Sequence, residues 1–144
     1  MPTTDPDLAP PRTPLAAAAV AVFLGGLLGG LAREGIVDLW PGGTIPWAVL
    51  TINAVGAFVL GMVVEVVTAR SLQRHPVLAA RVSRPLLGTG FCGGFTTFSS
   101  LAVALDTLAR DGRPLAAGAY LGLSLVLGLL AVASGSGVGR RAAR

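Results

Sequence analysis

Four apolar runs separated by short polar segments limit this chain to one class of fold. The runs cover Leu15–Ala32, Trp47–Val67, Leu86–Leu108 and Leu115–Ser134. Each is close to the roughly 20 residues that an α-helix needs to cross about 30 Å of hydrocarbon. Hydrophobic residues make up 53% of the chain and charged residues only 12%, a balance that argues against an ordinary soluble domain. We therefore expect an all-α membrane protein with four transmembrane helices.

The segments outside these runs are short and polar. Residues 1–14 are rich in proline and poor in apolar groups, so we expect a disordered N-terminal tail. Residues 15–134 form the predicted four-helix transmembrane domain. Residues 135–144 contain three of the arginines and are predicted to be a basic C-terminal tail.

The basic residues indicate membrane topology. All eleven are arginines, and most lie beside the apolar runs without aromatic platforms between them, which argues against nucleic acid as a partner. Arginines next to membrane helices are retained on the cytoplasmic side. Eight arginines fall on the side of both termini and the second connector, against three on the other side. We expect a multi-pass protein of the cell membrane with both termini in the cytoplasm.

Cysteine and histidine exclude several other classes of function. The chain has one cysteine, Cys92, and one histidine, His75, so neither an internal disulfide nor a cysteine zinc cluster can form. No nucleophile, base and orienting group converge in the sequence, so we do not expect an enzyme.

Glycines in the first run recur at the spacing of close helix packing. Gly25 pairs with Gly29, and Gly26 pairs with Gly30, each four residues apart. This spacing lets helix backbones approach closely in lipid, and it predicts a tight bundle or a dimer.

The third run contains a polar stretch, GFCGGFTTFSS, at residues 90–100. We expect Gly93 and Gly94 to break the helix at mid-span, where freed backbone groups must meet protein, water or an ion. Four hydroxyl side chains follow directly: Thr96, Thr97, Ser99 and Ser100. They favour a polar path or an ion site over a kink tolerated for packing. Loosened carbonyls without an acidic neighbour suit a monovalent cation.

Polar groups in the other runs are candidates to converge on this break. Asn53 in the second run is predicted either to bond across helices or to contact a transported species. Tyr120 and Ser124 lie one turn apart and share a helix face, and such donors suit an anion. Arg33 is either a headgroup anchor or a residue that draws anions to a vestibule, and Glu65 is predicted to be interfacial.

Three motifs together resemble the Fluc (CrcB) family of fluoride channels. They are GGLLGGLAR (25–33), NAVGAFVLG (53–61) and, most specifically, GFCGGFTTFS (90–99). The resemblance covers most of residues 24–134. It implies a four-helix subunit of an antiparallel dimer that exports fluoride passively and so reduces fluoride toxicity in the cytoplasm.

The resemblance also implies roles for individual residues. A central structural sodium ion would be held by the carbonyls of Gly93 and Thr96 in each subunit. The pore-lining residues would be Asn53, Thr97, Phe98, Ser99, Tyr120 and Ser124. Fluoride is compact and strongly hydrated, so amide, hydroxyl and aromatic-edge donors must replace its water.

Two departures from the family pattern keep other readings open. Leu101 stands where a second phenylalanine is usual, and Ala48 and Val49 stand where a Gly-Thr pair is usual. With the arginine imbalance, these departures favour a homologous partner over a second copy of this chain. A non-conducting structural or regulatory subunit is one alternative. A small multidrug exporter is another, although residues 15–32 lack the deep carboxylate that such a pump needs.

Overall fold

The computed structural model describes residues 14–40, 43, 45–72 and 82–143, with the side chains of residues 70–72 left out. The described residues are almost entirely helical. The elements are α1 (Leu15–Leu39), α2 (Trp47–Leu72), η2 (Arg84–Cys92), α4 (Gly93–Phe95), α5 (Phe98–Arg110) and α6 (Pro114–Ala142). η2 is a π-helix that opens with Pro85, and η2, α4 and α5 form one broken third span.

The prediction of four membrane spans is confirmed for the described part of the chain. Four helices there are long and apolar enough to cross a bilayer. All four run further than predicted, and two of them by the most. α1 continues beyond Ala32 to Leu39, and α6 continues beyond Ser134 to Ala142, through most of the predicted basic tail. Arg140 and Arg141 lie in the last turn of α6, where cations favour the negative end of the helix dipole. The residues after Ser134 therefore continue α6 as far as Ala142.

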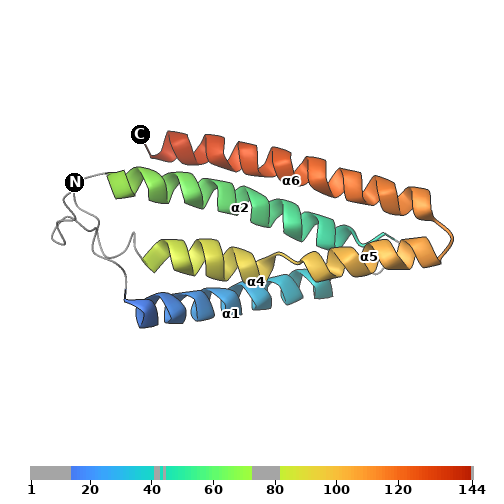
Figure 1. The fold of residues 1–144 in the computed structure, drawn as a ribbon, viewed down its shortest axis with the longest axis horizontal. Helices are drawn as coiled ribbons and strands as arrows, with labels where there is room; N and C mark the ends of the chain where they lie inside the picture. Colours follow the sequence, from blue (N-terminus) through green and yellow to red (C-terminus); the bar gives the residue numbers. More distant parts are fainter. Residues whose placement is uncertain (1–13, 41–42, 44, 73–81, 144) are drawn as a thin grey trace, which may run out of the picture.

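The four spans associate as two pairs of parallel helices (Figure 1). α1 lies along η2 and α4, whereas α2 lies along α6. Direction alternates along the chain, so spans two apart run the same way. α1 and η2 begin, and α2 and α6 end, at the same end of the bundle.

Glycines allow the helices of each pair to approach backbone to backbone. A Cβ atom at Gly25 would overlap the carbonyl oxygen of Leu86, and one at Gly135 would overlap the carbonyl oxygen of Phe58. Gly29 lies equally close to the third span, whereas a Cβ at Gly30 would meet no atom within 4 Å. The predicted close packing is therefore confirmed for the Gly25 and Gly29 face of α1. Small residues drive such contacts because lipid supplies no hydrophobic force between helices.

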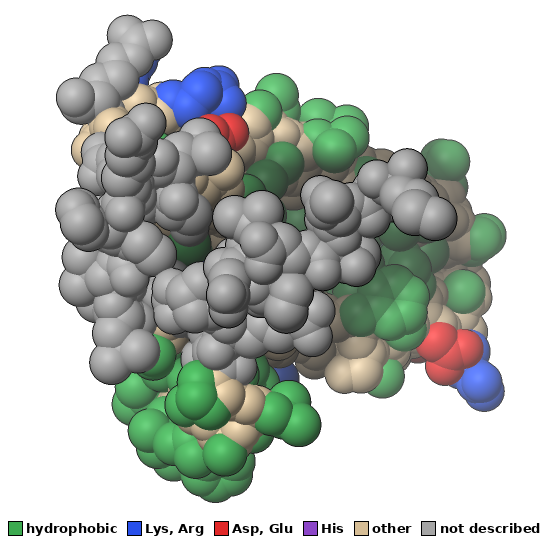
Figure 2. Space-filling model, turned by 60° about the vertical axis from the view of Figure 1, so that its left-hand side comes forward, with side chains coloured by type: hydrophobic (Ala, Val, Ile, Leu, Met, Phe, Trp, Pro, Cys, Tyr) green, Lys and Arg blue, Asp and Glu red, His purple; other side chains and the backbone are tan. Residues whose placement is uncertain are grey.

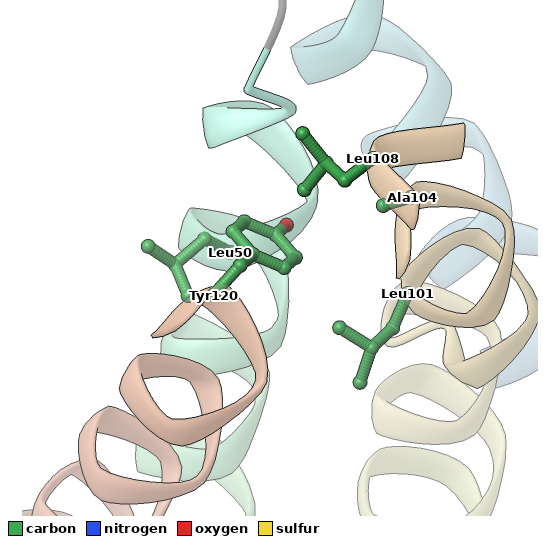
Figure 3. Close-up of a cluster of buried hydrophobic side chains, with 5 residues drawn as sticks. All are labelled: Leu50, Leu101, Ala104, Leu108 and Tyr120. Atoms are coloured by element: carbon green, nitrogen blue, oxygen red, sulfur yellow. The ribbon is translucent and has the colours of Figure 1, made fainter. Parts of the chain in front are cut away.

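A hydrophobic cluster joins α2, α5 and α6 near one end of the bundle (Figure 3). Its buried members are Leu50, Leu101, Ala104, Leu108 and Tyr120. Leu108 is only 1% exposed. The cluster holds α5, the part of the third span after the break, against α2 and α6.

The outer surface of the bundle is apolar along its sides. Many leucines and valines of α1 and α6 are exposed, and hydrophobic side chains cover much of the flank seen in Figure 2. The charged side chains in that view lie towards the ends of the molecule. This is the distribution expected of a protein whose sides face lipid.

Candidate functional site

The third span leaves helical geometry at Thr96 and Thr97. Thr96 has φ −79° and ψ 157°, and Thr97 has φ −146° and ψ 115°, so both are extended. Gly93, with φ −66° and ψ −37°, is helical. The predicted break at Gly93 and Gly94 is therefore wrong by a few residues. Glycine only permits a break. The backbone groups that a break releases need hydrogen-bond partners, and the fold supplies such partners to the backbone of Thr97.

Asn53 of α2 supplies the partners for the Thr97 backbone. Its Oδ1 accepts the Thr97 amide at 2.8 Å, and its Nδ2 donates to the Thr97 carbonyl at 3.1 Å. The bond to the amide replaces the one that Thr97 N would have made in a continuous helix, and the bond to the carbonyl adds to the first bond of α5, which the N-cap carbonyl accepts. An amide group carries two protons on Nδ2, and the carbonyl of Thr97 uses one. The second remains available as a donor.

The Thr97 side chain begins α5. Thr97 is only 7% exposed, and its Oγ1 accepts the Ser100 amide at 3.1 Å as an N-cap. The same oxygen donates to Ser100 Oγ at 3.0 Å and lies 3.1 Å from Ser99 Oγ. Capping by a threonine hydroxyl satisfies an amide that has no intrahelical partner. Three hydroxyls thus form one connected group at the break.

The same bonds free two carbonyls from their usual helical donors. In a continuous helix the amide of residue i+4 bonds the carbonyl of residue i, so Thr97 N would bond Gly93 O, and Ser100 N would bond Thr96 O. Here Thr97 N bonds Asn53, and Ser100 N bonds the Thr97 hydroxyl. The Cys92 carbonyl, in contrast, keeps the Thr96 amide at 2.9 Å and gains the Thr96 hydroxyl at 2.8 Å.

A cation at this place would bind neutral oxygens, either backbone carbonyls or the side-chain oxygens of the break. Within the described residues, no three His, Cys, Asp or Glu side chains come together in a way that could hold a metal. The freed carbonyls of Gly93 and Thr96 are neutral oxygen ligands. Such a ligand set fits a hard monovalent cation better than a transition metal.

A groove of about 460 Å³ runs past the break between α2 and the third span. Its lining includes Asn53, Gly93, Thr96, Thr97 and Phe98, which unites five of the predicted site residues. Phe98 is 82% exposed, and a Cβ at Gly93 would meet no atom within 4 Å. Both residues therefore border open space in the single chain. Phe98 begins α5 and lines this groove with an exposed side chain.

A second groove of about 420 Å³ holds the remaining hydroxyls of the break. Ser99, Ser100 and Thr107 line it, with Val49 and Pro46 of the α2 side. The Thr97 hydroxyl, which borders the first groove, bonds Ser99 and Ser100 in the second. The hydroxyl group therefore connects the two grooves across the third span.

Tyr120 and Ser124 border neither of the two grooves beside the break. Tyr120 is 4% exposed, and its hydroxyl donates to the Pro46 carbonyl at 3.0 Å. Ser124 Oγ donates to the carbonyl of Tyr120 at 2.8 Å. In the single chain both hydroxyls are bonded to backbone, so a pore-lining role for these two residues stays a prediction.

The two ionisable residues named from the sequence lie near opposite ends of the bundle. Arg33, in α1, pairs with the neighbouring Glu34 at 2.8 Å. Glu65, in α2, pairs with Arg140 of α6 at 2.9 Å. The interfacial position predicted for Glu65 agrees with its pairing near the end of α6.

Sequence reasoning missed several residues that border the grooves. Gly88 and Thr89 of η2 line the first groove, and Thr107 of α5 lines the second. The π-helix decides which η2 side chains face the groove, and no local sequence signal announces a π-helix. Thr107 lies two turns after Ser100, so helical spacing from the hydroxyl stretch was the available signal.

Comparisons with known proteins agree on one family. Residues 20–136 match the family described as CrcB-like protein, Camphor Resistance (CrcB). Fluoride-specific ion channel FluC 1 of Mycobacterium bovis is 44% identical over 119 residues, covering 78% of this chain and 82% of that protein. Fluoride-specific ion channel FluC 2 of Nocardia farcinica is 37% identical over 137 residues, covering 94% and 92%.

A third relative has a similar name. Fluoride-specific ion channel FluC of Chlorobium chlorochromatii is 41% identical over 120 residues, covering 81% of this chain and 88% of that protein. The chain therefore belongs to the CrcB family.

Proposed function

We propose that this chain is a subunit of a fluoride-specific ion channel in the cell membrane, and not an enzyme. The observation that carries this function is the break at Thr96 and Thr97, stabilised by Asn53 in the middle of an apolar bundle. A transmembrane backbone leaves helical geometry only where protein, water or an ion meets it. The relatives described above are fluoride-specific ion channels by name. Passive export would lower fluoride in the cytoplasm.

The groove residues provide the chemistry that a small anion needs. Fluoride must exchange tightly held water for donors along its path. The second amide proton of Asn53 is such a donor, and so is the hydroxyl proton of Ser100, because Ser100 Oγ accepts from Thr97. The exposed Phe98 ring offers its electropositive edge, which binds weakly and so allows an ion to leave. Uncharged donors of this kind favour conduction over trapping.

We infer that the freed carbonyls of Gly93 and Thr96 hold a structural sodium ion. The fit rests on the hydrogen bonds of Thr97 and Ser100, which leave these two oxygens without their helical donors. When bound, sodium would offset the partial negative charge of the carbonyls. Gly93 keeps the approach open, because a Cβ there would meet no atom of the same chain within 4 Å.

We further propose that the open groove is completed by a second subunit in an antiparallel dimer. An uncovered ring at Phe98 and an uncovered glycine at Gly93 are features of a surface that another chain covers. The arginine imbalance between the two sides would give this chain one fixed orientation. A homologous subunit of opposite orientation is therefore favoured over a second copy.

A non-conducting subunit is the second candidate, and one observation favours it. Leu101 is buried in the hydrophobic cluster with Leu50 and Tyr120, so it presents no aromatic edge to the path. The multidrug-exporter reading gains no support, since the described charged side chains lie near the ends of the spans.

A liposome efflux assay tests the function directly. Vesicles loaded with potassium fluoride or potassium chloride receive this chain alone, or this chain with a homologous subunit from the same genome. We expect electrogenic fluoride efflux that needs no proton gradient and exceeds chloride efflux by orders of magnitude. Equal chloride flux, or strict dependence on a proton gradient, would contradict the channel. Flux only in the mixed vesicles would identify a heterodimer, and no flux in either would favour the non-conducting subunit.

A further inference from the structure

The end of the bundle where α2 and α6 end and η2 begins is rich in arginine. Its described charged side chains are Glu65, Arg84, Arg140 and Arg141, and we call this set the basic end. Figure 2 brings this end forward and shows basic side chains beside an acidic one. Three arginines against one carboxylate leave a positive excess on the described residues.

Among the described residues, the opposite end carries as many arginines as the basic end but more carboxylates. Its described charged residues are Arg33, Glu34, Asp38, Asp106, Arg110, Asp111 and Arg113. Two of these arginines are paired, Arg33 with Glu34 and Arg110 with Asp106, both at 2.8 Å. Positive excess is therefore a property of the basic end and not of both membrane surfaces.

The ion pair of Glu65 determines which of the described arginines at the basic end are available. Glu65 Oε1 accepts from Arg140 Nη1 at 2.9 Å, which links α2 to α6. Among the described residues, Arg84 and Arg141 make no ion pair. Both are exposed, and Arg141 lies in the last turn of α6. Two guanidinium groups thus remain for a partner outside the chain, while Arg140 is held within it.

The chemistry of these two guanidinium groups, and their position at the ends of membrane helices, fit the phosphate of a lipid headgroup. Guanidinium groups bind phosphate oxygens through two parallel hydrogen bonds. Arginine at the end of a membrane helix reaches the headgroup layer with its stem along apolar surface. Attraction to an anionic leaflet contributes a factor of roughly five in binding per arginine close to the surface.

We propose that the basic end binds anionic phospholipid headgroups through Arg84 and Arg141, and that Glu65 withholds Arg140 from the same interaction. The proposal concerns the membrane around the protein and does not depend on which ion the protein conducts. It also gives Glu65 a role that can be measured: this carboxylate limits the preference for anionic lipid.

The test measures binding of two lipids to the purified full chain in a neutral detergent. Short-chain phosphatidylglycerol and short-chain phosphatidylcholine are titrated separately, and the shift of the thermal unfolding midpoint gives an apparent affinity for each. We expect the wild-type chain to prefer phosphatidylglycerol roughly 25-fold, about fivefold for each of the two free arginines. Arg141→Gln should lower this preference roughly fivefold, and Glu65→Gln should raise it by a similar factor because Arg140 is released.

Arg113→Gln is the matched control, since it removes an arginine from the opposite end. Equal affinity of the wild-type chain for the two lipids would overturn the proposal. So would a loss of preference in Arg113→Gln as large as that in Arg141→Gln, or an unchanged preference in the double variant Arg84→Gln, Arg141→Gln. Inorganic phosphate at the same concentration should not reproduce the shift, and if it does, the end binds free anions and not lipid.

Discussion

Asn53→Leu provides the sharpest test of how the break is stabilised. Leucine is close to asparagine in shape but cannot accept the Thr97 amide or donate to the Thr97 carbonyl, the bonds of 2.8 and 3.1 Å. Each buried backbone group left without a partner costs about 1–3 kcal/mol. Values in membrane proteins fall at the low end, because the unfolded chain in lipid also finds partners. The Thr97 amide loses its partner, whereas the Thr97 carbonyl keeps the first bond of α5. We therefore expect a loss of about 1–2 kcal/mol in unfolding free energy.

The assay is reversible unfolding in detergent, with fluoride efflux measured in parallel. Asn53→Asp separates stability from conduction, because its carboxylate can still accept the Thr97 amide. Two unit charges about 4 Å apart repel by roughly 4 kcal/mol at an effective dielectric constant near 20. This repulsion corresponds to fluoride efflux about a thousandfold lower at neutral pH, with a smaller loss of stability than in Asn53→Leu.

Ser134→Ala serves as the control, since this exposed serine of α6 bonds only the carbonyl of Leu130 in its own helix. It should change unfolding by less than about 0.5 kcal/mol, as surface substitutions usually do. An Asn53→Leu variant that unfolds like this control would refute the reasoning, because the Thr97 backbone would then not need Asn53. A silent Asn53→Asp variant would refute only the pore-lining role.

Three further predictions follow from the same contacts. Gly94→Ala should destabilise the subunit, because the added Cβ would overlap the carbonyl of Gly26. Gly93→Ala should leave unfolding of the subunit unchanged but reduce dimer formation, measured by light scattering, and fluoride efflux. Equal unfolding midpoints for the two variants would contradict this packing. Leu101→Phe should cost about 1–3 kcal/mol by overpacking the cluster with Tyr120, without lowering fluoride efflux per folded channel; a midpoint at or above wild type would show that the cluster has room for a ring. Reporter fusions at the C-terminus should give only a cytoplasmic signal, while comparable signals from both sides would indicate dual topology.

The spans were predictable because their signal is local. Each apolar run is long enough to indicate a membrane helix by itself. The helix ends were not, since Arg33 continues α1 and Arg140 continues α6 although both residues are charged. A charged side chain ends an apolar run but not a helix. The register of the π-helix η2 was also beyond a reading of local sequence, because packing against α1 fixes it.

The residues of the site were easier to predict than the hydrogen bonds that they make. Asn53 and the threonines were selected as rare polar groups in apolar runs, and the structure brings them together. The position of the break was misjudged, since it depends on a partner 44 residues away. Tyr120 shows the same limit: its hydroxyl finds the Pro46 carbonyl, 74 residues away. Distant partners of this kind are decided by the fold and leave no mark in the neighbouring sequence.

The pairing of parallel helices has a consequence for how the protein is made. Every close glycine contact among the described residues joins the first two spans to the last two, as at Gly25 with Leu86 and Gly135 with Phe58. Neither half can therefore complete its packing while the other is still on the ribosome, and α1 must wait in the bilayer for a partner that is synthesised two spans later. A gene split between α2 and η2 should yield two fragments that are degraded singly and accumulate only when both are expressed.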